Sequence, residues 1–152
     1  MARKHERTAA RRAAAQVLYS AAIREMSAAD LLKDGLVDCL EHPLTDYSLR
    51  LISGIEERGA EIDAIISRLA KNWTLERMPL MDVTIIRIAL FEMLHVDEVP
   101  ISVSINEAVE LAKCFGCEDD SPKFVNGMLG SVARQMEAEV PDEVVCKEGD
   151  GQ

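Results

Sequence analysis

Apolar residues recur every three or four positions along most of the chain, which is the spacing of one side of an α-helix. The first such stretch runs from about residue 7 to residue 23, and Arg7 and Arg11 border its apolar stripe one turn apart. No segment shows the strict alternation of a β-strand. The stripe consists of Ala10, Ala14, Val17, Leu18 and Ala21.

The next two periodic stretches have clear start signals. Ser27, followed three residues later by an acid, predicts the start of a second helix. Thr45 caps a third element, whose apolar residues continue to about residue 69. Gly54 and Gly59 lie inside this element, and we expect them to bend it or to let another helix approach closely.

The segment Val83–Leu94 is apolar on almost every side, so we expect it to be the central helix of the fold. Arg87 and Glu92 interrupt it, and each charge must be paired or must reach the surface. The next helix carries Ser104 and Glu107 at the spacing of a capping box, although the helix can also begin one turn earlier.

A final helix is predicted from Ser121 as N-cap and Pro122 as its first residue. Asn126-Gly127 would be a hairpin signal between strands, but its neighbours have helical periodicity. Glycine inside a helix costs about 1 kcal/mol relative to alanine, so we expect another helix or a bound molecule to approach Gly127 closely. The pattern predicts about six helices in one compact all-α domain.

Charge is distributed unevenly along the chain. The net charge is -10 and the pI is about 4.8, yet residues 1–12 carry net +4 and residues 137–152 carry net -5. We expect a basic N-terminal arm over residues 1–6, one helical domain over 7–138 and an acidic, disordered tail over 139–152. A chain this acidic contacts nucleic acid only through a local basic patch, if at all.

Other features of the sequence narrow its class. No apolar run reaches the roughly 18 residues of a membrane span, and polar residues interrupt the Ala-rich start, which disfavours a secretory signal. Four scattered cysteines fit a reduced, cytoplasmic setting. We find no phosphate loop and no catalytic triad motif, so we expect neither an enzyme nor a cofactor.

The pair Cys114 and Cys117 has the CxxC spacing of half a zinc site or of a redox pair. A zinc site needs a second pair, and a thioredoxin-like site needs a preceding strand, so two ordinary cysteines are the simpler interpretation. The basic start is either a solvated terminus or a phosphate-binding patch, to which Tyr19 and Phe124 could add base stacking.

Three stretches carry a resemblance to a known family. They are RRAAAQVLYS at 11–20, IIRIALFEML at 85–94 with Asp82 before it, and PISVSINEAVELAKCFG at 100–116 followed by DSPKFVNGMLG at 120–130. From about Arg7 to Val132 the chain resembles the NusB family of bacterial transcription antitermination factors. The resemblance implies a compact two-subdomain bundle of six to seven helices.

The resemblance also implies a function and its partners. Family members bind boxA-type single-stranded RNA in ribosomal RNA leaders together with NusE, a ribosomal protein, and help RNA polymerase resist termination. Some form homodimers. The implied RNA surface comprises Lys4, Arg7, Arg11, Arg12, Tyr19, Arg87, Asp120, Ser121, Lys123 and Phe124. The implied NusE interface comprises Glu76, Arg77 and Asp82.

Two alternatives remain open from the sequence. A helical protein–protein adaptor with little RNA affinity fits the net charge of -10. A related helical RNA-binding module precedes the catalytic domain of certain ribosomal RNA cytosine methyltransferases, but we expect no cofactor-binding domain after the helical domain here.

Overall fold

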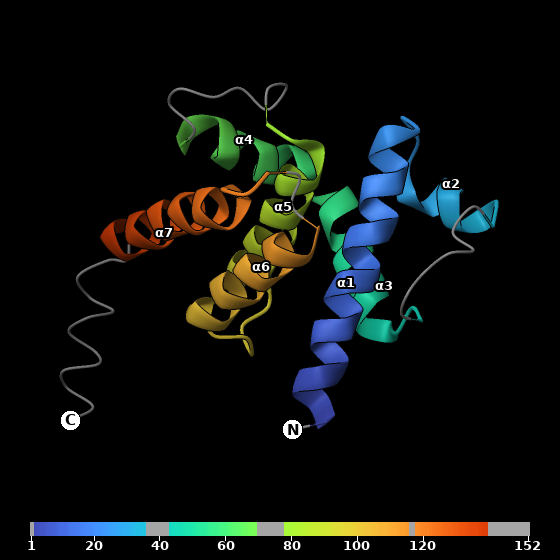
Figure 1. Ribbon diagram of the computed structural model, residues 1–152, viewed down its shortest axis with the longest axis horizontal. Helices are drawn as coiled ribbons and strands as arrows, with labels where there is room; N and C mark the ends of the chain where they lie inside the picture. The colour runs from blue at the N-terminus through green and yellow to red at the C-terminus, as the bar shows by residue number, and fades with distance from the viewer. Residues whose placement is uncertain (1, 36–42, 70–77, 116–117, 140–152) are drawn as a thin grey trace.

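The computed structural model describes residues 2–35, 43–69, 78–115 and 118–139, which form seven α-helices and no β-strand (Figure 1). The predicted all-α fold of six to seven helices is therefore confirmed. The helices are α1 (Ala2–Ile23), α2 (Ala28–Lys33), α3 (Asp46–Glu57), α4 (Gly59–Leu69), α5 (Leu80–His95), α6 (Ile101–Phe115) and α7 (Ser121–Glu139).

The helices form two groups that lie side by side (Figure 1). One group contains α1, α2 and α3, and the other contains α4, α5, α6 and α7. Helix α5 joins them, because α1 and α3 pack on it from one side while α6 and α7 pack on it from the other. This arrangement agrees with the expected two-subdomain bundle.

Helix α5 is central, as its apolar character predicts. Every residue from Met81 to Met93 is buried except Arg87, which is half-buried. Thr84 is one of the buried polar residues of α5, and its hydroxyl donates a hydrogen bond to the carbonyl oxygen of Leu80 at 2.8 Å. The two buried acids of α5 must find partners on other helices.

Helix α1 is longer than the sequence pattern indicates, since it begins at Ala2 rather than near residue 7. Residues 2–6 are therefore helical and continuous with α1, although the side chains of residues 2–4 lie outside the described set. The predicted apolar stripe is buried except Leu18, which is half-buried, and Arg11 lies on the same buried side.

The third predicted element is two helices, because the chain turns at Arg58 between α3 and α4. A Cβ atom on Gly54 would overlap the ring of Phe91, so the expected close approach is confirmed there. A Cβ on Gly59 would meet nothing within 4 Å. Gly59 instead opens α4 directly after the turn.

Helix caps agree with the sequence in two places and differ in a third. The side chains of Ser27 and Thr45 accept backbone N–H bonds at the starts of α2 and α3, at 3.1 and 3.3 Å. The capping box at Ser104 does not start the helix, and the alternative start one turn earlier is confirmed, because α6 begins at Ile101. Pro100 directly before that start is the signal for the earlier boundary.

Asn126 and Gly127 lie inside α7, as their periodic neighbours indicate. The expected close approach of another helix to Gly127 is wrong, since the residue is exposed and an added Cβ would meet no atom of the described chain within 4 Å. None of the helices in the described part of the chain has both the length and the apolar character needed to cross a lipid bilayer.

Candidate nucleic-acid interface

Arg11 lies in the interior, at the point where α1 crosses α5 and α6. Its residue exposure is 3%. Its Nε donates to Glu92 Oε2 at 2.8 Å, and its Nη1 donates to Glu107 Oε1 at 3.1 Å. One guanidinium thus bridges two carboxylates from two other helices, which meets the expectation that Glu92 needs a partner.

A tyrosine on α3 extends this network toward the surface. The Tyr47 hydroxyl donates to the same Glu92 oxygen that Arg11 binds. Burial, and then this hydrogen bond, raise the pKa of Tyr47 far above its ordinary value, so the hydroxyl stays protonated. The other oxygen of Glu92 has no hydrogen-bond partner among the described residues.

Arg7 occupies the outer end of the same helix face. Its guanidinium lies 4.6 Å from the centre of the Tyr47 ring, within the range of a cation–π contact. Its Nη2 also lies 3.5 Å from Glu98 Oε2. The Arg7 side chain is partly exposed and its guanidinium contacts the face of the Tyr47 ring, whereas Arg11, one turn away, is buried.

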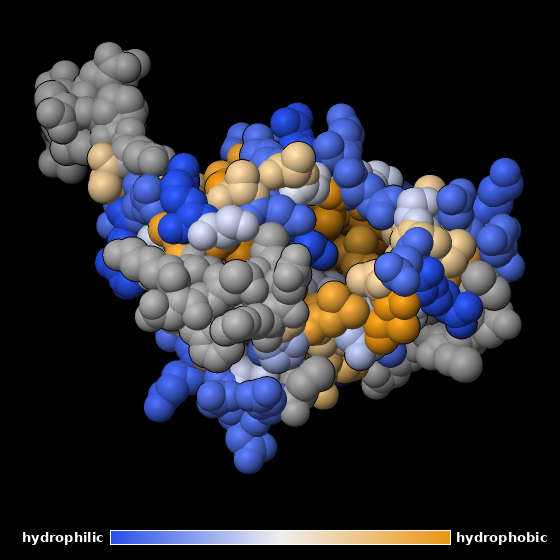
Figure 2. Space-filling view, turned by 90° about the horizontal axis from the view of Figure 1, so that it is seen from above, coloured by the Kyte–Doolittle hydropathy of each residue, from blue (hydrophilic) through white to orange (hydrophobic). Residues whose placement is uncertain are grey.

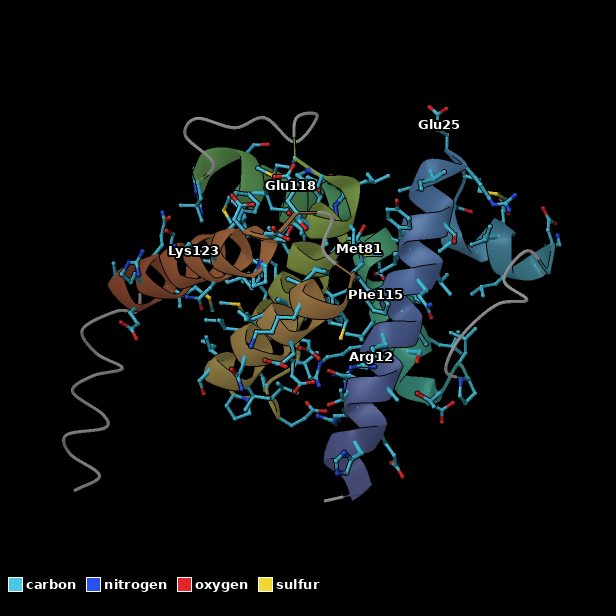
Figure 3. The ribbon with its side chains drawn as sticks, viewed as in Figure 1. Arg12, Glu25, Met81, Phe115, Glu118 and Lys123 are labelled. Carbon is cyan, nitrogen blue, oxygen red and sulfur yellow. The ribbon has the colours of Figure 1, made fainter. Side chains whose placement is uncertain are left out.

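Arg12 points toward α6 instead of toward α3. Its Nη2 donates to Cys114 Sγ at 3.3 Å, close to Phe115 at the end of α6 (Figure 3). Cys114 is a free, exposed thiol, while Cys117 lies outside the described residues. Within the part of the chain that is described, no group of three metal-binding side chains occurs.

The start of α7 is built around Ser121, which is buried within the helix and is not an exposed cap. The Ser121 hydroxyl donates to Asp82 Oδ2 at 3.0 Å and accepts the backbone N–H of Glu118 at 3.2 Å. Asp82 is 2% exposed, and its Oδ1 has no partner among the described groups. Burial, followed by the nearby charges of Glu118 and Asp120, raises the pKa of Asp82.

The remaining residues of the α7 start face outward to different degrees. Lys123 is exposed, and in Figure 3 it lies beyond α6 from Arg12, so these two cations are not adjacent. Phe124 and Tyr19 are half-buried and pack on the core. Asp120 is exposed, and its carbonyl accepts the N–H of Phe124 at 2.9 Å.

Arg87 belongs to a different part of the surface. Its guanidinium forms a two-pronged ion pair with Asp63 of α4, at 2.8 and 3.0 Å. The pair lines a pocket of about 280 Å³ among α1, α3, α4 and α5. Figure 2 views the molecule from the side of α4, where polar residues surround a middle in which apolar residues reach the surface.

The predicted residues therefore do not form one continuous surface. Arg7 and Arg12 share the first half of α1, and Lys123 shares the start of α7 with its neighbours. The side chain of Lys4, like Glu76 and Arg77, lies outside the described residues. Two residues that the sequence places on the RNA surface are buried in the structure, namely Arg11 and Ser121.

Sequence reasoning missed four residues that shape the α1 surface. Three of them contact Arg7 or Arg11 from distant parts of the chain, and Arg50 contacts Glu98, so no local motif marks them. The one usable signal was the charge of Glu92 inside an apolar helix, which demands a partner. The missed residues are Tyr47, Arg50, Glu98 and Glu107.

Known proteins resemble this chain over most of its length. A model of the NusB family matches residues 8–134. The transcription antitermination protein NusB of Streptomyces avermitilis is 41% identical over 128 residues, which cover 82% of this chain and 88% of that protein. The protein of the same name from Salinispora tropica is 41% identical over 130 residues, which cover 84% of this chain and 94% of that one.

The resemblance extends to three dimensions. A solved structure of T. maritima NusB has 33% sequence identity and a TM-score of 0.75, and the match covers 90% of this chain and 94% of that one. The family match spans all seven helices at least in part. The chain belongs to the NusB family.

Proposed function

We propose that this protein is a transcription antitermination factor of the cytoplasm. It binds boxA-type single-stranded RNA of ribosomal RNA leaders together with NusE, and it helps RNA polymerase resist termination without catalysing a reaction. The observation that carries this proposal is membership of the NusB family over residues 8–134, a span that contains most of α1 and the whole start of α7.

The geometry supports separate roles for the residues of the RNA surface. Arg7, Arg12 and Lys123 reach the surface and are suited to contact phosphates. Half-buried Phe124 and Tyr19 are suited to stack on bases. These five side chains belong to α1 and α7, so an RNA strand that contacts all of them must pass over the end of α6.

Interior residues of the predicted surface act differently in this proposal. Arg11 holds α1 against α5 and α6 and thereby orients the exposed arginines. Ser121 likewise fixes the start of α7 to Asp82. Asp82 contributes to NusE binding by positioning this junction, because only 2% of the residue is exposed. Arg87, paired with Asp63, positions α4 against α5.

A second candidate is a protein–protein adaptor with little RNA affinity. The observation that favours it is that two of the predicted RNA-binding arginines, Arg11 and Arg87, are engaged by carboxylates of the same chain. Together with the net charge of -10, this leaves a small basic surface.

A titration of a boxA-type RNA oligonucleotide, with and without NusE and at several salt concentrations, separates the two candidates. We expect tighter binding with NusE and a decrease of log K with log salt. Arg7→Ala should weaken binding and reduce the slope by about 0.7, the value for one lost phosphate contact on a single strand. Arg68→Ala, on an exposed position at the end of α4, removes the same charge away from the proposed surface and should change little.

A salt-independent or undetectable affinity, combined with intact NusE binding, would support the adaptor instead. Equal effects of Arg7→Ala and Arg68→Ala would contradict the assignment of the α1 surface.

A further inference from the structure

Two arginines from different helices converge on one carboxylate oxygen. Arg50 of α3 places Nη1 2.9 Å from Glu98 Oε2, and Arg7 of α1 places Nη2 3.5 Å from the same atom. Glu98 belongs to the connection between α5 and α6, and its side chain is 50% exposed. The oxygen therefore sits at the surface, between two cations from elements far apart in the sequence.

The protein positions these cations by more than their contact with Glu98. The Arg7 guanidinium lies over the Tyr47 ring, and the Tyr47 hydroxyl is bonded to Glu92 in the core. Arg50 follows Tyr47 on the same helix, one turn from its start. Removal of the carboxylate would leave the aromatic support of Arg7 in place.

An anion other than Glu98 can use the same two donors. Guanidinium groups bind phosphate and carboxylate oxygens with the same geometry, and the phosphate carries more oxygen acceptors. Exposed ion pairs contribute only about 0–1 kcal/mol, because solvent screens them and both side chains lose freedom. Arg50 is 44% exposed and Arg7 is 22% exposed, so the present pairs are of this weak kind.

The space beside Arg7 and Glu98 suits a nucleotide. A pocket of about 330 Å³ has Val99, Pro100 and Val103 on its apolar side, and its polar side is formed by Arg7, Arg11, Glu98 and Glu107. Val103 is itself partly exposed, at 39%. A phosphate held by the arginines would thus have an apolar surface next to it for its sugar or base.

We propose that Arg7 and Arg50 form a binding site for one phosphate of the RNA backbone, and that the carboxylate of Glu98 occupies this site in the free protein. RNA binding then requires Glu98 to leave, so this residue lowers RNA affinity. The inference rests on the proposed function, because it assumes an RNA ligand. It adds Arg50 and Glu98 to the RNA surface, and it makes Glu98 a competitor of the ligand.

The test compares two variants with the same change of charge at neighbouring positions. Glu98→Gln removes the competing charge, whereas Asp97→Asn removes an exposed charge for which the structure shows no ion pair with either arginine. We expect Glu98→Gln to tighten binding of a single-stranded boxA-type RNA about two- to fivefold, the range that surface ion pairs allow. Asp97→Asn should have a smaller effect.

A second variant, Arg50→Gln, removes one of the two proposed phosphate donors. It should weaken RNA binding and reduce the salt slope by about 0.7. In the Arg50→Gln background, the gain from Glu98→Gln should shrink, because one of the two phosphate donors is absent. The melting temperature of each variant should match that of the unchanged protein, since the side chains of Arg50, Asp97 and Glu98 are all exposed.

Equal effects of Glu98→Gln and Asp97→Asn would overturn the inference and show that only the overall charge matters. An unchanged salt slope in Arg50→Gln would also overturn it. A gain in NusE affinity without a gain in RNA affinity would assign the two arginines to a protein carboxylate instead. If the unchanged protein shows no salt-dependent RNA binding at all, the proposed function itself fails, which is a separate outcome.

Discussion

Arg11 offers the sharpest test of how α1 works, because the resemblance places it on the RNA while the structure places it in the interior. Replacing Arg11 with alanine would leave the carboxylates of Glu92 and Glu107 buried without their shared cation. Glu92 already has one oxygen without a partner among the described residues. Removal of one member of a buried ion pair costs about 3–5 kcal/mol.

That loss is large compared with the total stability of a domain, which is typically about 5–15 kcal/mol. For a chain of this size, each kcal/mol shifts the melting temperature by roughly 2–4 °C, so Arg11→Ala should melt about 6–20 °C lower. Urea unfolding, followed by far-ultraviolet circular dichroism, measures the change in free energy directly.

Arg12→Ala is the matched control, because it removes the neighbouring arginine, whose one described hydrogen bond goes to the exposed Cys114. Its free energy of unfolding should stay within about 0.5 kcal/mol of the unchanged protein. A triple variant, Arg11→Met with Glu92→Gln and Glu107→Gln, should recover part of the loss, since it buries no charge. The reasoning is refuted if Arg11→Ala unfolds like the unchanged protein but no longer binds RNA.

Three further substitutions test the helices and their packing. Gly127→Ala should stabilise the protein by about 0.5–1 kcal/mol, because the new methyl meets open space in a helix. Gly54→Ala should destabilise it by about 1–3 kcal/mol, because its Cβ overlaps the ring of Phe91; the same sign for both glycines in urea unfolding would contradict this contrast. Asp82 has a folded pKa above its ordinary 3.8, so its uncharged form adds stability at low pH that is lost as the pH rises through the folded value. The stability of Asp82→Asn relative to the unchanged protein should therefore increase from pH 4 upward, and parallel pH profiles would rule out this role for Asp82.

The helices and the central place of α5 could be predicted because periodicity is a local property of the chain. Val83–Leu94 has no polar side, so it could only be the middle of the bundle. A bend at Gly54 or Gly59 was expected, but the division into α3 and α4 was not, because the apolar spacing continues across Arg58. A turn of this kind changes the direction of the chain without interrupting the pattern.

The candidate site was harder to predict because it depends on how helices cross. The sequence indicates that Glu92 needs a partner, but the choice of Arg11 follows from the crossing of α1 over α5. The same crossing decides that Arg7, one turn earlier, stays at the surface. Glu98 is separated from Arg7 by more than ninety positions, so no motif of neighbouring residues could have linked them.

The two ion pairs of Arg11 have a consequence for the thermodynamics of the proposed RNA binding. A basic segment that orders only when it meets its ligand loses conformational entropy at that moment, and its affinity falls accordingly. Helix α1 is already ordered in the free protein, because Arg11 joins it to Glu92 and Glu107 from within. In the proposed RNA complex, the conformational entropy of forming this helix would already have been lost on folding, so RNA binding would not have to offset it.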